Sequence, residues 1–210
     1  GGKGVDEAIT NAAGENFQKI RKKRTTITPG KSNPLDTGKN QVRILTGDAK
    51  IAIGQFGTIP AGGIIDAVGP NYETYESENK IKLDKYHNAL QSAYINSIIL
   101  AEDKNFNEIA FPLISSGLFK GDQNIETIYT KTLEGIINFV ISKKISKKPI
   151  IKLKKITLIV LNDEYKTKLE NILNECRPYI FFDKEKNDVY IPTIFNKKII
   201  MNNHGNILND

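Results

Sequence analysis

Cysteine is nearly absent from this sequence, and tryptophan is absent altogether. Of 210 residues only Cys176 carries a thiol, which excludes an internal disulfide framework and offers no cysteine-based metal spacing. No apolar run approaches the roughly 20 residues that span a bilayer, and residues 1–14 lack the apolar stretch of a secretory signal. We therefore expect no membrane association and a reducing compartment, cytoplasmic or nuclear, with secretion into another cell left open.

Acidic residues are fewer than basic ones. The chain has 24 Asp and Glu against 30 Lys and Arg, for a net charge of +6 and a pI of about 9.2. Much of the excess lies in KIRKKR (residues 19–24) and KKISKKPIIKLKK (residues 143–155). A basic surface attracts polyanions such as nucleic acid, but no aromatic residues are interleaved with these lysines as in single-strand binders. We favour a solvated lysine-rich face and keep nucleic-acid binding as an alternative.

Short apolar runs alternate with amphipathic segments along the chain. Helical spacing of apolar residues predicts helices over 5–24, 81–103, 124–144 and 164–176. Apolar runs predict strands over 42–45, 49–53, 64–68, 108–117, 155–163, 178–183, 188–192 and 197–203. This alternation predicts an α/β protein, a three-layer α/β/α sandwich with a mixed central sheet. The length fits one domain over residues 1–210.

The chain starts with a glycine-rich turn, GGKGVDEAITNAAG, that runs into the first predicted helix. Gly2 and Gly4 let backbone N–H groups approach a phosphate at the helix start. Such a loop normally follows a strand, and the predicted strand over 197–203 supplies one when the chain end is read into its beginning. We therefore expect adjacent termini, with residues 197–210 completing the loop that continues at 1–14.

A second candidate phosphate loop lies at the end of the predicted strand EIAFPLISSG (108–117). Ser115, Ser116 and Gly117 come where that strand ends, and open α/β sheets place ligands at the carboxyl ends of their strands. Leu118 and Phe119 follow directly. An exposed aromatic ring after such a loop can pack on the face of a sugar, and we expect this of Phe119. The alternative is that Phe119 is buried in the hydrophobic core.

In this circular order, several segments resemble the macro domain, an ADP-ribose-binding module. NHGN (203–206) stands at the family's N-A-A-N turn, and GKGVDEAITNAAG (2–14) resembles its glycine loop and helix. TGDAKIAIGQFGTIPAGGIIDAVGPNY (46–72) resembles its T-G-D-A stretch and V-G-P strand, and IAFPLISSGLFKGD (109–122) its second phosphate loop. The chain thus resembles a circularly permuted macro domain, similar to the MacroD-type ADP-ribosyl hydrolases.

The resemblance implies ADP-ribose as ligand or product, an ADP-ribosylated protein as partner, and no further cofactor or metal. It implies that Asp6 positions or deprotonates the water that attacks the distal ribose, and that Asn206 orients the hydroxyls of that ribose. Both are expected as catalytic residues. The implied ligand-binding residues are Gly2, Gly4, Val5, Asn203, Ser115, Ser116, Gly117, Leu118 and Phe119.

Three departures from the family pattern leave the activity open. Thr10 stands where several hydrolases carry histidine, Lys3 replaces a loop glycine, and Lys120 replaces the glycine after the aromatic residue. A hydrolase of mono-ADP-ribose on proteins, or of a related ADP-ribosyl ester, is the favoured hypothesis. A reader of ADP-ribose or poly(ADP-ribose) without turnover is the first alternative, and a basic nucleic-acid-binding protein is the second. The oligomeric state is not predicted.

Overall fold

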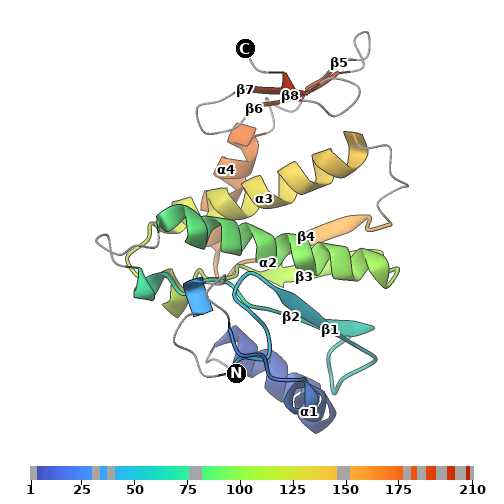
Figure 1. Cartoon of the computed structure of the whole chain (residues 1–210). Coiled ribbons are helices and arrows are strands. Elements are labelled where there is room, and N and C mark those ends of the chain that lie inside the picture. The colour runs from blue at the N-terminus through green and yellow to red at the C-terminus, as the bar shows by residue number, and fades with distance from the viewer. Residues whose placement is uncertain are drawn as a thin grey trace.

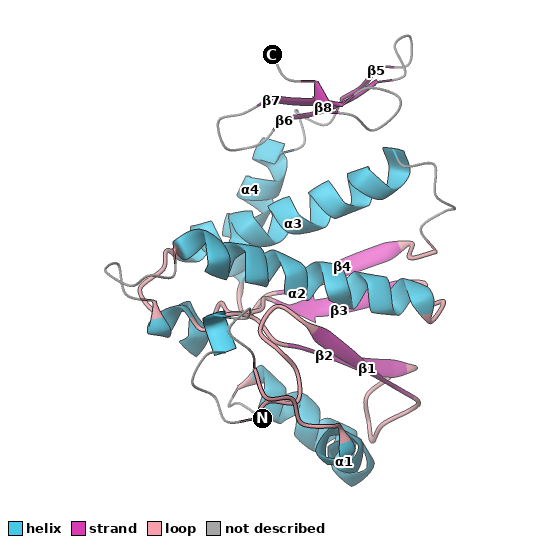
Figure 2. Cartoon of the chain, in the orientation of Figure 1, coloured by secondary structure: helices cyan, strands magenta, loops and turns pink. Residues whose placement is uncertain are grey.

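The computed structural model describes most of the chain as alternating helices and strands (Figures 1 and 2). The described residues are 4–29, 34–36, 41–75, 82–145, 152–176, 181–183, 188–192, 198–201 and 207–208. The helices are α1 (Val5–Lys23), α2 (Leu83–Asp103), α3 (Ile125–Ile145) and α4 (Asp163–Cys176), with 3₁₀ turns η1 (Pro34–Asp36), η2 (Tyr72–Thr74) and η3 (Leu118–Lys120). The strands are β1 (Ala49–Ile53), β2 (Gly63–Ala67), β3 (Glu108–Pro112), β4 (Lys155–Ile159), β5 (Phe181–Asp183), β6 (Asp188–Pro192), β7 (Lys198–Met201) and β8 (Ile207–Leu208).

The described strands fall into three sheets rather than the single central sheet expected. β1 and β2 pair antiparallel, with Ile51 opposite Ile65, whereas β3 and β4 pair parallel, with Ala110 opposite Thr157. β5 to β8 form a separate antiparallel sheet in sequence order. Parallel and antiparallel pairs therefore coexist, which confirms the mixed α/β class. No hydrogen-bonded pairing joins β2 to β3 among the described residues.

The larger core forms around α2, whose buried side chains recur at helical spacing. Leu90 and Tyr94 on α2 are fully buried and pack with residues of β3, α3 and α4. The ring of Tyr94 meets Phe111 on β3 with centroids 5.1 Å apart. Because β3 ends one residue beyond Phe111, this core fixes the point where the candidate loop begins.

A smaller core holds α1 against β1 and β2. Phe17 packs on Phe56 with ring centroids 5.4 Å apart, and Ala13, Ala52 and Ile64 complete the cluster. Figure 1 shows α1 and α2 on opposite sides of the β1–β2 pair, so the three-layer arrangement holds there. No described helix is both long and apolar enough to cross a membrane.

The first helix is broken at Gly14, although the sequence predicts an unbroken helix over 5–24. Gly14 has φ 74° and ψ −171°, a backbone region almost restricted to glycine. The two halves of α1 therefore point in different directions. After the break, Arg21 and Arg24 both reach Asp66 on β2.

The circular permutation is not supported by the structure. β7 and β8 belong to the β5–β8 sheet, which Figure 1 places beyond α4, at the opposite end of the molecule from α1. The predicted strand over 197–203 is confirmed in part as β7, but it pairs with β6 and β8. Gly2, Asn203 and Asn206 lie outside the described residues.

Candidate functional site

The loop that follows β3 carries the second set of predicted ligand-binding residues. Ser115 has φ 58°, in the left-handed region that residues other than glycine rarely adopt. Its Oγ donates to the Pro70 carbonyl oxygen at 2.7 Å, and the Ser116 Oγ donates to the Leu113 carbonyl oxygen at 2.7 Å. Both hydroxyl protons therefore hold the loop itself.

Tyr94 of α2 fixes the start of the same loop from the core. The Ile114 N–H donates to the Tyr94 hydroxyl oxygen at 2.8 Å, and that hydroxyl donates to the Pro112 carbonyl oxygen at 3.5 Å. Burial raises the pKa of Tyr94 to about 12, so the hydroxyl stays protonated and able to donate. A strained loop residue held by several contacts is typical of ligand sites.

Several backbone N–H groups of this loop lack a hydrogen-bond partner within the described part of the chain. Those of Ser115, Gly117 and Leu118 have no hydrogen-bond acceptor among the described residues. Leu118 and Phe119 then project outward, with 77% and 48% of their surface exposed. The core alternative for Phe119 is therefore wrong, and the loop presents N–H donors beside an exposed aromatic ring.

Lys120, which departs from the family pattern, stabilises the loop from within. Its Nζ donates to the carbonyl oxygens of Gly121 at 2.8 Å and Gln123 at 2.7 Å. The lysine thus satisfies two carbonyl groups where the chain leaves η3. A cavity of about 340 Å³ lies beside this turn, between η2 and the residues that follow η3.

Asp6 takes part in a network at the first turn of α1. Arg21 donates through Nη2 to Asp6 Oδ1 at 2.9 Å and through Nη1 to Thr10 Oγ1 at 2.8 Å. Thr10 Oγ1 in turn donates to the Asp6 carbonyl oxygen at 2.6 Å. The Asp6 side chain stays 36% exposed. The predicted catalytic carboxylate is thus held by an arginine from the second half of the broken helix.

Arg21 also ties this network to β2. Its Nε lies 3.3 Å from Asp66 Oδ1, and Arg24 Nη1 lies 2.5 Å from Asp66 Oδ2. The sequence signal for these cations was the KIRKKR cluster, which we interpreted as a solvated face. The cluster does not reveal the acidic partner of these arginines, because Asp66 lies about 40 residues further along the sequence, on β2.

The predicted site residues fall into two groups in the structure. Gly4 precedes α1 and accepts the first helical hydrogen bond from Ala8 N at 3.0 Å, and Val5 is exposed. No hydrogen bond between described residues joins Gly4 or Val5 to the loop 115–119. No group of three His, Cys, Asp or Glu in the described part of the chain could hold a metal ion.

Comparison with known sequences identifies the family. The sequence model of the macro domain matches residues 1–127, more than half of the chain, so the chain belongs to the macro domain family. The match runs in the ordinary order of the family from residue 1 onward, which also gives no support to a permutation. The resemblance drawn from the glycine loop and the loop after β3 is thereby confirmed.

Individual relatives agree with this assignment. The O-acetyl-ADP-ribose deacetylase of Escherichia fergusonii is 36% identical over 123 residues, which cover 57% of this chain and 55% of that protein. The Escherichia coli K12 protein of the same name is 32% identical over 119 residues, 57% of this chain and 55% of that protein. The chain spans about half the length of these curated relatives. A mutant Oceanobacillus iheyensis macrodomain solved with ADPR superimposes with a TM-score of 0.61 at 25% identity, covering 85% of this chain and 80% of that one.

Proposed function

We propose that this chain binds ADP-ribose, free or attached to a protein, and hydrolyses an ADP-ribosyl bond. The bond is that of an ester such as O-acetyl-ADP-ribose, or of mono-ADP-ribose on a modified protein. The loop after β3 carries the proposal, because it places free N–H donors beside an exposed aromatic ring at the carboxyl end of a strand. Relatives named as O-acetyl-ADP-ribose deacetylases support the choice of substrate class.

In this proposal the diphosphate lies along the loop after β3. The N–H groups of Ser115, Gly117 and Leu118 donate to its oxygens, since oriented backbone amides suit an anion. Phe119 packs on the distal ribose. The glycine turn with Gly2 and Gly4 forms the facing wall, and Asn203 is proposed to brace the ligand loop.

Hydrolysis needs a group that accepts a proton from the attacking water. Asp6 is the proposed group, and Asn206 is proposed to orient the ribose hydroxyls, since an amide both donates and accepts. Arg21 holds one Asp6 oxygen at 2.9 Å, and this fixes the direction of the carboxylate. A base must come within hydrogen-bond reach of its water, and the partly exposed position of Asp6 permits that.

A reader that binds ADP-ribose without turnover is the second candidate. The observation that favours it is the network of Asp6, Thr10 and Arg21. Arg21 occupies Oδ1 of the Asp6 carboxylate, which restricts how a water molecule can approach that oxygen. Thr10 holds the helix turn within that network and supplies no imidazole.

Calorimetric titration with ADP-ribose tests the binding proposal. Phe119→Ala should weaken binding about five- to tenfold, because an aromatic contact contributes about 1 kcal/mol. Ile53→Ala is the matched control, since Ile53 is also about half exposed, at 56%. It pairs with Gly63, at the end of β2 that lies away from the candidate loop. No binding by the natural chain at high micromolar ADP-ribose would contradict both candidate functions.

Turnover distinguishes the hydrolase from the reader. The chain is incubated with O-acetyl-ADP-ribose and, separately, with a mono-ADP-ribosylated protein, and released product is measured. Asp6→Asn keeps the shape of the side chain and removes its charge, so the rate should fall about 100-fold or more while ADP-ribose still binds. Binding of ADP-ribose without any release of product would exclude the hydrolase and support the non-catalytic reader.

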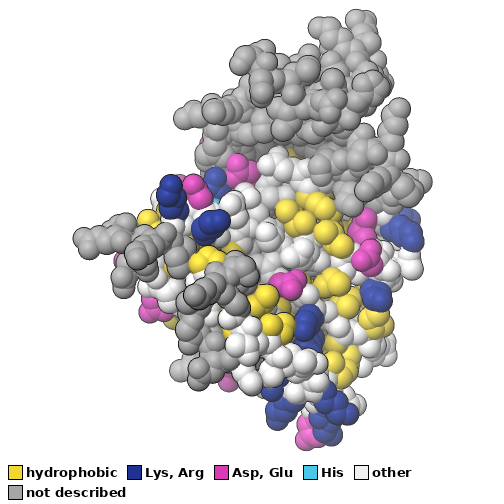
Figure 3. Space-filling model, in the orientation of Figure 1, with side chains coloured by type: hydrophobic (Ala, Val, Ile, Leu, Met, Phe, Trp, Pro, Cys, Tyr) yellow, Lys and Arg dark blue, Asp and Glu magenta, His cyan; other side chains and the backbone are white. Residues whose placement is uncertain are grey.

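The nucleic-acid alternative is tested by salt. Figure 3 shows Lys and Arg side chains at the end of the molecule where α1 lies, and further ones spread over the rest of this face. Retention of polynucleotide on filters should then fall steeply with salt if phosphates are contacted. Absence of such retention removes this alternative and leaves the ADP-ribose proposal unaffected.

A further inference from the structure

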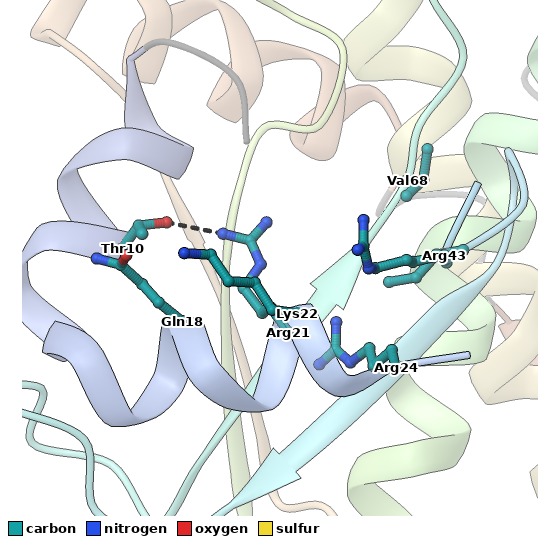
Figure 4. Close-up of a pocket in the computed structure, with 8 residues that line it drawn as sticks. Thr10, Gln18, Arg21, Lys22, Arg24, Arg43 and Val68 are labelled. Carbon is teal, nitrogen blue, oxygen red and sulfur yellow. Dashed lines mark hydrogen bonds between the residues drawn. The ribbon is translucent and has the colours of Figure 1, made fainter. Parts of the chain in front are cut away.

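A cavity of about 760 Å³ beside the second half of α1 is lined by cations. Arg21, Lys22 and Arg24 reach it from α1 and the residue after it, and Arg43 comes from the segment before β1. Figure 4 shows the guanidinium groups of Arg21, Arg24 and Arg43 around one hollow. None of the described residues that line it is acidic. The cavity is distinct from the loop after β3, none of whose residues lines it.

The charges around this cavity do not balance. Asp6 and Asp66 are the carboxylates paired with its arginines. Arg21 engages both of them, and Arg24 engages Asp66. Among the described residues, four cations stand against these two carboxylates, an excess of two positive charges at the cavity wall. Such an excess in a concave site concentrates anions.

Arg24 has an unmet hydrogen-bond donor at the same wall. Its side chain is only 10% exposed, and its Nη2 is buried without a partner among the described residues. Nη1 is occupied by Asp66. Leaving a buried charged N–H group without an acceptor is unfavourable. An anion in the cavity would supply that acceptor if the Arg24 guanidinium turned Nη2 toward it.

We propose that this cavity binds a dianionic phosphate group. Two negative charges match the excess of two positive ones, and a guanidinium fork suits phosphate oxygens in pairs. Ile44 and Val68 form an apolar part of the wall, which suits the organic body of a phosphate monoester. The volume lies within the range of small-molecule sites. Free phosphate and a monoester are the two sources of this chemistry.

The test is a calorimetric titration of the whole chain with inorganic phosphate and, separately, with phenyl phosphate. Arg24→Lys keeps a cation beside Asp66 but removes the second arm of the fork, so the affinity for both probes should fall about tenfold. Tighter binding of phenyl phosphate identifies a monoester as the source, and equal affinities identify free phosphate. Either result supports the proposal, and binding of neither probe overturns it.

Matched charge changes separate a built site from diffuse attraction. Arg43→Gln and Lys23→Gln each remove one positive charge, but Lys23 is exposed and does not line the cavity. Arg43→Gln should weaken phosphate binding about fivefold or more and Lys23→Gln less than about twofold. Equal losses would overturn the proposal. Because Arg43 is exposed, this comparison remains decisive even if Arg24→Lys does not fold.

The two ligand sites can be separated by their variants. Arg24→Lys should leave ADP-ribose affinity unchanged, and Phe119→Ala should leave phosphate affinity unchanged. Loss of phosphate binding in Phe119→Ala would place the phosphate in the ADP-ribose site and overturn this inference. Retention of polynucleotide without binding of either small probe would also overturn it, in favour of a nucleic-acid surface.

Discussion

Replacing Gly69 by alanine tests whether the loop after β3 is held by the segment that follows β2. A Cβ at Gly69 would lie 2.3 Å from both Ile114 Cγ2 and Ser115 Oγ. The Ser115 hydroxyl is fixed to the Pro70 carbonyl oxygen at 2.7 Å, so the loop cannot yield without losing that bond. Overpacking costs about 1–3 kcal/mol and the bond about 1 kcal/mol. For a chain of this size the melting temperature should fall on the order of 10 °C.

The assay combines thermal unfolding with ADP-ribose titration. Gly117→Ala is the control, because a Cβ there has no atom within 4 Å. This variant should melt like the natural chain but bind ADP-ribose more weakly, since the methyl group lies on the face that a phosphate would approach. A Gly69→Ala variant that melts and binds like the natural chain would refute the reasoning about this contact.

Three further substitutions probe the break in α1, the buried histidine and the loop anchor. Gly14→Ala should cost about 1–3 kcal/mol, measured by chemical denaturation with an unchanged slope, because φ 74° and ψ −171° do not suit alanine. Burial, with Lys131 next, lowers the pKa of His87 below its ordinary 6.5, so the folded state binds fewer protons than the unfolded state. The contribution of His87 to the free energy of unfolding should be fully present above about pH 6.5 and be lost as the pH falls toward the folded-state pKa. The free energy of unfolding, measured between pH 7.5 and 5.5, should therefore depend less on pH in His87→Asn than in the natural chain. Tyr94→Phe removes the acceptor of the Ile114 N–H and should cost about 1–3 kcal/mol and weaken ADP-ribose binding, by the same two assays.

The helices were predictable because each has a strong apolar face. The expected helix over 81–103 is observed as Leu83–Asp103, and that over 124–144 as Ile125–Ile145. The expected strand over 42–45 is wrong, since only Val42 forms a bridge, with Ile27. A short apolar run does not by itself determine whether a partner strand will pair with it.

The expected adjacency of the two chain ends is not supported, because it depends on a sequence pattern alone. The glycine loop pattern calls for a preceding strand, and the predicted strand over 197–203 fits that pattern. That strand instead pairs with its neighbours β6 and β8. Strand pairing is decided by three-dimensional packing, whereas the motif only indicates that a strand is needed. The loop after β3 was predictable because a strand, a turn and an exposed aromatic residue follow one another directly.

The surroundings of Asp6 illustrate what local patterns leave out. The sequence identified Asp6 by its place after the glycine turn, and Thr10 by its place one helical turn on. Neither position indicates that Arg21 reaches back to both residues, because this depends on the break at Gly14. An isolated glycine in a helical pattern is a signal for such a break, and it was available at Gly14.

β2 is the element through which the two halves of the candidate site are held. Its Asp66 binds Arg21, which in turn holds Asp6. The segment that follows β2 supports Ser115 through Pro70. The first half rests on the small core around Phe17 and the second on the large core around Tyr94, so the direct contacts of each half are made in a different core. A displacement of β2 should therefore disturb the proposed catalytic carboxylate and the candidate loop together, although α2, which anchors that loop through Tyr94, also contacts β1 directly.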